Sequence, residues 1–379
     1  MARPSVDIGT TARTLAIGTA GGAVFWTLGL PLAFLSGAAA GVAACALAGV
    51  KVGLNASLRD VFIVLLGLTL GSTVTPDTLA MLPRWPVTMA GLAAAMLSIM
   101  WTGAFYLERV HGLDRATARL ASMPGALNFV MTLAVETTSD ARRVAIIQIV
   151  RMTALLLLLP SLVSMFGEAP SGNFFQPAGD VVKPLQLVVL IAAGFASAAV
   201  FKRLGTPAPA LFGGMLIAAL LYGPGLLTTA MPTPILFATF VVLGSMIGSN
   251  FAGADMRLFL VTVVAGMGTL LVTSLVALAW ALAAAWIVGL PVLQVWLGYA
   301  PGGVETTALL AMALGLDAAF VSSHHIMRVV ILNLTRAAVD CAVHAQAGRR
   351  GVAAAAILKT ASPRARRETC WHMPPPYPR

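Results

Sequence analysis

Charged residues are scarce in this chain: Asp, Glu, Lys and Arg together make up 10% of its 379 residues, whereas 59% are hydrophobic. A soluble protein of this length needs far more charged surface, so the composition excludes that class. Apolar runs long enough to cross about 30 Å of hydrocarbon recur along nearly the whole sequence. Because these runs are continuous rather than alternating, they favour membrane-spanning helices over a β-barrel. We therefore predict an all-α integral membrane protein.

Cysteine and histidine are also rare. The three cysteines, Cys45, Cys341 and Cys370, show no paired spacing, so we expect neither a disulfide framework nor a zinc site. The five histidines are too few and too scattered for the metal cluster that an oxidoreductase of the monooxygenase kind needs. We therefore expect no enzyme, no cofactor and no bound metal.

Acidic residues are outnumbered by basic ones, 14 to 24, which gives a formal net charge of +10. In a membrane protein an excess of Lys and Arg marks cytoplasmic loops, so the charge does not indicate nucleic-acid binding. No helix-turn-helix fits outside the apolar segments, and we expect no direct contact with DNA. The lipid bilayer is the main partner that the composition predicts.

One stretch of the sequence has a later counterpart, at an offset of 177: ASMPGALNFV (121–130) matches GYAPGGVETT (298–307) without gaps. Residue types that are rare in so apolar a chain keep their spacing. The pairs are Pro124 and Pro301, Gly125 and Gly302, Asp140 and Asp317, and Arg151 and Arg328. Upstream, LGLTLGS (66–72) resembles LGSMIGS (243–249), and GLPLAFLSG (29–37) resembles GTPAPALFG (205–213) at an offset shorter by one. We infer an internal duplication.

The duplication divides the chain into two homologous halves. The first membrane repeat covers about residues 10–166 and the second about 184–336, with the polar linker 167–183 between them. The basic segment 337–379 has no counterpart, and its composition predicts a disordered tail to which we assign no function.

Each half contains four hydrophobic segments, then a Pro-Gly segment and then a final apolar helix. The apolar segments are about 12–28, 31–50, 61–76, 85–107 and 140–166 in the first half, and 184–201, 206–222, 233–252, 257–288 and 317–336 in the second. The Pro-Gly segments occupy about 114–138 and 291–315. Each of these either crosses the membrane or enters it and returns.

The distribution of basic residues favours the re-entrant alternative. If the Pro-Gly segments return and the N-terminus is cytoplasmic, nearly all basic loop residues fall on the cytoplasmic side. If the segments crossed, five would move outside: Arg142, Arg143, Lys202, Arg203 and Arg257. Five crossings per half is an odd number, so the second repeat is inserted upside down. Ten crossings then place both termini in the cytoplasm. Inverted repeats with Gly/Pro-interrupted segments in corresponding positions are typical of secondary transporters.

The second Pro-Gly segment carries Pro301, Gly302 and Gly303 in succession. Proline removes a backbone donor, and glycine permits unusual dihedral angles and close approach. Such a break exposes backbone N–H and C=O groups that can bind an ion or an anionic substrate. The alternative is a simple helix kink. Recurrence at Pro124 and Gly125 favours a binding site.

Glu305 and Thr306 directly follow this break, and Glu305 aligns with Asn128 of the first half. A carboxylate here could bind a cation or carry a proton. Alternatively, it stabilises a helix N-terminus through the free amide groups. Thr306 could add a hydroxyl ligand, or bond its own backbone.

Arg151 and Arg328 each lie 11 residues, or about 16 Å of helix, beyond an aspartate that we expect to cap that helix. An unpaired arginine at this depth is costly, so each needs a carboxylate, a set of carbonyl groups or an anionic ligand. Substrate binding and a fixed structural pairing both remain open.

His325 precedes Arg328 by one turn and aligns with Gln148. An imidazole could shuttle protons near neutral pH. Because Gln148 offers only hydrogen bonds in the other half, a structural role for His325 is equally supported.

The patterns YAPGGVETTALLAMALGLDAAFVSSHHIMRVV and ASMPGALNFVMTLAVETTSDARRVAIIQIVRM resemble the membrane-bound AbrB-like family, also described as ammonia monooxygenase-like or aidB-regulator-like proteins. The resemblance covers residues 10–336. Members of this family carry the duplication and are linked to regulation of gene expression, which the resemblance implies for this chain. Asn128 departs from the more acidic or serine-rich first motif of the family, which argues against two equivalent sites.

The leading hypothesis is a multi-pass secondary transporter of a small solute or ion in the cytoplasmic (inner) membrane, with its two Pro-Gly segments meeting near the midplane. The plan is similar to that of glutamate and citrate symporters with paired re-entrant loops, an analogy at the level of fold. The alternative is a membrane regulator or sensor that does not transport, and an ammonia monooxygenase is the least favoured. A homodimer is compatible with this plan.

Overall fold

A computed structural model of the protein describes residues 6–30, 32–124, 127–166, 180–206 and 208–332. Its contacts divide the chain into two units, Met1–Val329 and Val330–Arg379, and the description below concerns the first. Every regular element among the described residues is helical, apart from one isolated bridge between Val181 and Ala230. The structure thus agrees with the predicted all-α class.

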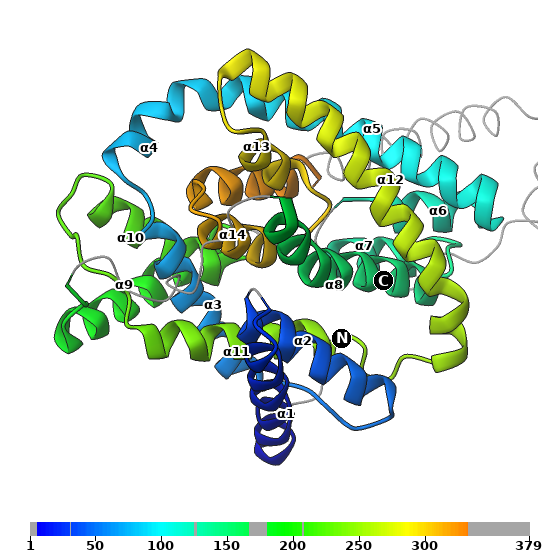
Figure 1. Cartoon of the computed structure of the whole chain (residues 1–379), viewed down its shortest axis with the longest axis horizontal. Helices are drawn as coiled ribbons and strands as arrows, with labels where there is room; N and C mark the ends of the chain where they lie inside the picture. Colours follow the sequence, from blue (N-terminus) through cyan, green and yellow to red (C-terminus); the bar gives the residue numbers. More distant parts are fainter. Residues whose placement is uncertain (1–5, 31, 125–126, 167–179, 207, 333–379) are drawn as a thin grey trace, which may run out of the picture. The chain divides into compact units, whose positions relative to one another are not determined.

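The helices follow one another in the order that the apolar segments predict (Figure 1). In the first half they are α1 (Ile8–Thr27), α2 (Ala33–Leu47), α3 (Ala56–Gly71), α4 (Pro76–Met81), η1 (Leu82–Arg84), α5 (Trp85–His111), α6 (Arg115–Ser122), α7 (Leu127–Glu136) and α8 (Ala141–Phe166). In the second half they are α9 (Pro184–Arg203), α10 (Pro209–Tyr222), α11 (Thr233–Ser249), α12 (Met256–Val288), α13 (Val292–Tyr299) and α14 (Val304–Ala313), followed by the helix Ala318–Leu332.

Four described helices are long and apolar enough to cross a membrane: Thr78–His111, Ala141–Pro160, Pro184–Arg203 and Met256–Val288. Four shorter apolar helices accompany them: Ala33–Leu47, Pro209–Tyr222, Thr233–Ser249 and Ala318–Leu332. These helices are consistent with an all-α membrane protein. The number of crossings and the inverted insertion of the second half stay predictions.

The two halves share unusual backbone conformations at corresponding positions. Leu32 and Ala208, which correspond in the upstream match, are the described non-glycine residues with a positive φ, 50° and 49°. Both are the N-cap residues of their helices, α2 and α10. Gly112 and Gly289, which correspond at the offset of 177, end α5 and α12 in the left-handed conformation that glycine adopts without steric cost. Because left-handed residues other than glycine are uncommon, their recurrence at the predicted offset supports the duplication.

Glycine contacts connect one half with the other. A Cβ at Gly67 in α3 would collide with the carbonyl oxygen of Leu211 in α10. A Cβ at Gly244 in α11 would collide with the carbonyl oxygen of Leu35 in α2. Small residues allow this close approach of helix backbones, as they do in membrane bundles. The two contacts are equivalent: α3 of the first half packs against α10 of the second, and α11 of the second half packs against α2 of the first.

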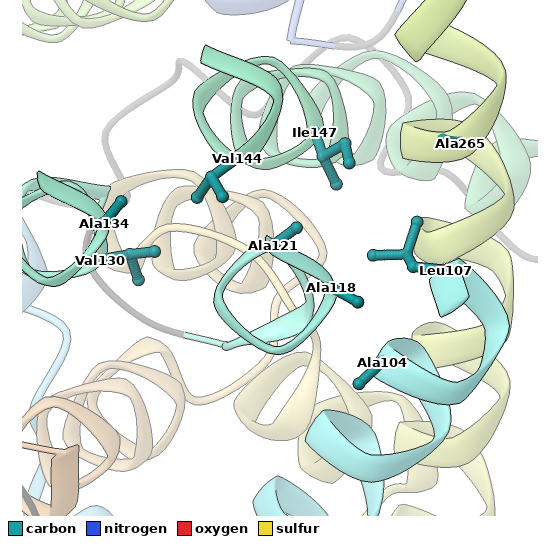
Figure 2. Packing of buried hydrophobic residues seen from close by; sticks show 9 residues of the cluster. All are labelled: Ala104, Leu107, Ala118, Ala121, Val130, Ala134, Val144, Ile147 and Ala265. Carbon is teal, nitrogen blue, oxygen red and sulfur yellow. The ribbon is translucent and has the colours of Figure 1, made fainter. Parts of the chain in front are cut away.

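A hydrophobic core holds α6 and α7 among longer helices (Figure 2). It is formed by α5, α6, α7, α8 and α12 through Ala104, Leu107, Ala118, Ala121, Val130, Ala134, Val144, Ile147 and Ala265. Packing of this kind fixes the position of the first Pro-Gly segment, because most of these side chains are fully enclosed.

Candidate functional site

Each Pro-Gly segment is a pair of short helices that returns to its starting point. The backbone N–H of Asp140, at the start of α8, donates to the Thr117 hydroxyl oxygen in α6 at 2.8 Å. In the second half the N–H of Asp317 donates to Oε1 of Gln294 in α13 at 3.3 Å. A single kinked helix of this length would separate these residues by about 35 Å. The segments are therefore hairpins rather than kinked helices.

The polar residues at the base of the first hairpin also cap its helices. Asp114 accepts the N–H of Thr117 at 2.9 Å, and this hydrogen bond lowers the pKa of the Asp114 carboxyl. Asp140 accepts the N–H groups of Arg142 and Arg143 at 3.1 and 3.2 Å. Asp317 accepts the N–H of Phe320 at 2.9 Å in the second half. The predicted helix-capping role of the two repeated aspartates is confirmed.

Arg151 of α8 lies in the first break and is 1% exposed. Its guanidinium donates to three carbonyl oxygens at the C-terminal end of α6, those of Ala121, Ser122 and Met123, at 3.4, 3.2 and 3.0 Å. It also donates to Oε1 of Gln148 at 2.7 Å. The positive charge therefore lies at the negative end of the α6 dipole.

Arg328 has the corresponding position in the second break and is 2% exposed; its bond to Ala300 is the counterpart of the bond from Arg151 to Met123. Its guanidinium donates to the carbonyl oxygens of Ala300 and Gly302 at 2.9 and 2.6 Å, beside the C-terminal end of α13. It also contacts Nδ1 of His325 at 2.6 Å. Among the described residues, no carboxylate forms a salt bridge with Arg328 or Arg151.

Gln148 and His325 have the same role in these networks. The amide nitrogen of Gln148 donates to the carbonyl oxygens of Leu120 and Met123 at 3.1 and 2.9 Å. Nε2 of His325 lies 2.8 Å from the carbonyl oxygen of Leu297, the counterpart of Leu120. Because arginine can only donate, Nδ1 of His325 accepts, and its ring proton is on Nε2. A neutral imidazole thus presents one donor and one acceptor, as the glutamine amide does.

The remaining residues of the predicted site lie around the two breaks. Pro124, Pro301 and Gly302 are buried, and Gly303 is the N-cap of α14. Thr306 is buried as well, at 3% exposure. Gly125 and the side chains of Asn128 and Glu305 lie outside what the structure describes; the backbones of Asn128 and Glu305 belong to α7 and α14.

The first half contacts the second break directly. A Cβ on Gly302 would lie 2.5 Å from Cδ2 of Leu155, which is one helical turn beyond Arg151 in α8. Gly302 is also the residue whose carbonyl oxygen accepts from Arg328. The two buried arginines are therefore close to each other, and their charges repel.

A second polar cluster, around His324, could not be predicted from the sequence. Nδ1 of His324 lies 2.8 Å from the carbonyl oxygen of Phe320, and Nε2 lies 2.8 Å from the hydroxyl of Thr88 in α5. The hydroxyl of Tyr299 donates to the carbonyl oxygen of Thr88. This cluster joins α5 to the second hairpin, although the two elements belong to different halves of the sequence.

Thr117 and Gln294, which close the two hairpins, were also not identified from the sequence, although their matching positions in the two halves could have indicated them. They are polar residues at the offset of 177 that differ in type, so a search for identical residues passes over them.

Nothing among the described residues brings three or more His, Cys, Asp or Glu together as a metal site would require.

Comparison with known proteins identifies relatives over most of the chain. A family model described as transition state regulatory protein AbrB matches residues 34–339. The uncharacterized protein YhjN of Bacillus subtilis (strain 168) is 25% identical over 349 residues, covering 84% of this chain and 89% of that protein. The putative regulator AbrB of Escherichia coli (strain K12) is 25% identical over 297 residues, covering 76% and 82%. The chain therefore belongs to the AbrB family, as the resemblance of its two repeated motifs implied.

Proposed function

We propose that this AbrB-family protein is a secondary transporter that carries a small solute or ion across the cytoplasmic membrane. The observation that carries the proposal is the repeated break: in each half a buried arginine binds the carbonyl oxygen at the end of the first hairpin helix, that of Met123 or its counterpart Ala300. Interrupted helices in corresponding positions of two repeats are where secondary transporters bind their substrates.

The inverted insertion of the second half belongs to this proposal. Hairpins that return to their starting point support five crossings per half, because a returning segment adds none. In the proposal, all ten predicted apolar segments cross and both termini are cytoplasmic. At 15 and 14 residues, α2 and α10 are about 22 Å long, shorter than the hydrocarbon core. The packing of α2 against α11, and the burial of most of its residues, support a position of α2 inside the protein rather than against lipid.

A regulatory role is the second candidate, and the names of the family and of the Escherichia coli relative favour it. In this alternative the hairpins bind a metabolite without moving it, and binding changes contacts with another protein. The described residues give no direct support for DNA contact, since their elements are predominantly apolar helices.

Reconstitution in vesicles tests the proposal. The full chain is placed in proteoliposomes that contain a pH-sensitive dye, and a panel of small solutes is added under an imposed proton gradient. We expect at least one solute to change the internal pH in a protein-dependent manner, and Arg328→Ala to abolish the change. No protein-dependent flux with any solute or imposed ion gradient would refute transport.

A deletion strain separates the two candidates. If the protein regulates by transporting, a transport-inactive Arg328→Lys variant should fail to restore the normal expression profile. Full restoration by an inactive but folded variant would favour the regulator. An exposed basic residue, Arg257, supplies the matched control through Arg257→Lys.

A further inference from the structure

Backbone groups of both polarities meet at the second break, and Arg328 binds some of the carbonyl groups. A broken helix presents carbonyl groups at one end and N–H groups at the other, which attract cations and anions respectively. Arg328 already occupies the carbonyl groups of Ala300 and Gly302. The N-terminus of α14, the positive end of a dipole, follows directly with Gly303 as its N-cap and is a candidate position for a ligand.

The N-terminus of α14 is partly buried, and its N-cap residue forms no side-chain cap bond. That residue is Gly303, which has no side chain. The first backbone bond of the helix joins the N–H of Thr307 to the carbonyl oxygen of Gly303, so the N–H groups of residues 304–306 precede it. Thr306 is 3% exposed, and no hydrogen bond of its hydroxyl is found among the described residues. The N–H groups of a helix end of this kind need partners from outside the helix.

Two buried arginines lie beside this helix end, and no carboxylate of the described residues pairs with either. The side chain of Glu305, in the first turn of α14, lies outside what the structure describes. Nε of Arg328 and Nε of Arg151 are buried and have no hydrogen-bond partner among the described residues. Every partner of these two guanidinium groups in that part of the chain is a carbonyl oxygen or a neutral side chain. Two buried like charges without a counter-ion are strongly destabilising. An anion between them would remove that cost.

We infer that the solute of this transporter is a small anion, with carboxylate or oxyanion chemistry, bound at the N-terminus of α14 beside Arg328 and Arg151. That the anion is the transported solute rests on the proposed function, whereas the anion-binding site itself does not. N–H groups at a helix start bind such anions readily, and the Thr306 hydroxyl adds a further donor.

Thermal unfolding of the purified full chain in detergent tests the site without requiring transport. Acetate, sulfate and phosphate are titrated in a zwitterionic buffer, and acetamide, a neutral molecule of the shape of acetate, is the control. We expect a saturable rise in the unfolding temperature with at least one anion and none with acetamide. No saturable rise with any of the three anions, or an equal rise with acetamide, would overturn the inference.

Thr306→Val supplies the decisive variant, because it removes an unpartnered hydroxyl while keeping the shape of the side chain. We expect about tenfold weaker anion binding with an unchanged unfolding temperature in the absence of the anion. Arg257→Gln, at an exposed arginine, should leave binding unchanged and so controls for general salt effects. Unaltered anion affinity in Thr306→Val, or an equal loss in Arg257→Gln, would contradict the site.

The two proposals fail in different ways. If an anion stabilises the protein but vesicles show no uptake, the site stands and transport is refuted. If vesicles transport a cation or neutral solute and no anion stabilises the protein, transport stands and the anion site is refuted.

Discussion

Gln148 and His325 form the same pair of hydrogen bonds in the two halves, each donating to a leucine carbonyl oxygen of its hairpin and each contacting the arginine of its own break. The residue types differ, but the positions of donor and acceptor agree. The pair therefore shows what the duplicated site requires: a neutral side chain with one donor and one acceptor, held between a short helix and an arginine.

This equivalence predicts that His325→Gln is tolerated. The glutamine should restore both hydrogen bonds, so we expect the free energy of unfolding in detergent to change by no more than about 1 kcal/mol. His325→Leu should cost about 2–5 kcal/mol, because it leaves Arg328 and the Leu297 carbonyl oxygen without that partner. Denaturant titration measures both. Equal loss in the two variants would show that the imidazole itself is needed, as a proton shuttle would require.

The arginines should not be replaceable by lysine. Arg328 donates to two carbonyl oxygens and contacts His325 with one planar group, whereas an ammonium is a point charge on a flexible stem. We expect Arg328→Lys and Arg151→Lys each to lower the free energy of unfolding by about 2–4 kcal/mol through lost hydrogen bonds. The control is Arg257→Lys at an exposed position, which should have little effect. Native stability in both buried variants would show that charge alone is sufficient.

The positions of the helices could be read from the sequence, because apolar length and Pro-Gly punctuation are local signals. The capping aspartates and the paired arginines could be read as well, since each has a counterpart at a fixed offset. Carbonyl groups were one of the kinds of partner that the sequence left open for the arginines, but it could not show which carbonyl oxygens bind them, because no residue type reveals a backbone acceptor. The bond between His324 and Thr88 joins residues 236 positions apart, and it has no repeated counterpart to indicate it.

The glycine contacts between the halves predict a matched pair of destabilising substitutions. Gly67→Ala and Gly244→Ala should each force helix backbones apart and lower the free energy of unfolding by about 1–3 kcal/mol. Gly9→Ala in α1 is the control, because the added Cβ would meet its nearest neighbour at an ordinary 3.4 Å. If the pair α3 and α10 packs as the pair α11 and α2 does, the two substitutions should lower the free energy of unfolding by similar amounts. A large loss at one glycine alone would contradict that equivalence.

If the protein transports as proposed, we expect Glu305 to carry the coupling proton or ion. Glu305→Gln keeps the size of the side chain and removes its charge, so we expect solute exchange between vesicles of equal pH to persist while accumulation driven by the proton gradient disappears. Asp60→Asn, at an exposed aspartate paired with Arg59, should leave both activities unchanged. Retained gradient-driven accumulation in Glu305→Gln would exclude this residue as the proton carrier.

The re-entrant path of the first hairpin predicts the side from which its flanks are labelled. In a variant without the three native cysteines, Arg115→Cys and Arg142→Cys place single thiols at exposed positions in the first turns of α6 and α8. If the hairpin returns, a membrane-impermeant maleimide should reach both positions from the cytoplasmic side only. Val292→Cys, at the start of α13, should be reached from the opposite side, because an odd number of crossings inverts the second half. Labelling of Arg142→Cys from outside would mean that the hairpin crosses, which would remove both the inversion and the ten-crossing topology.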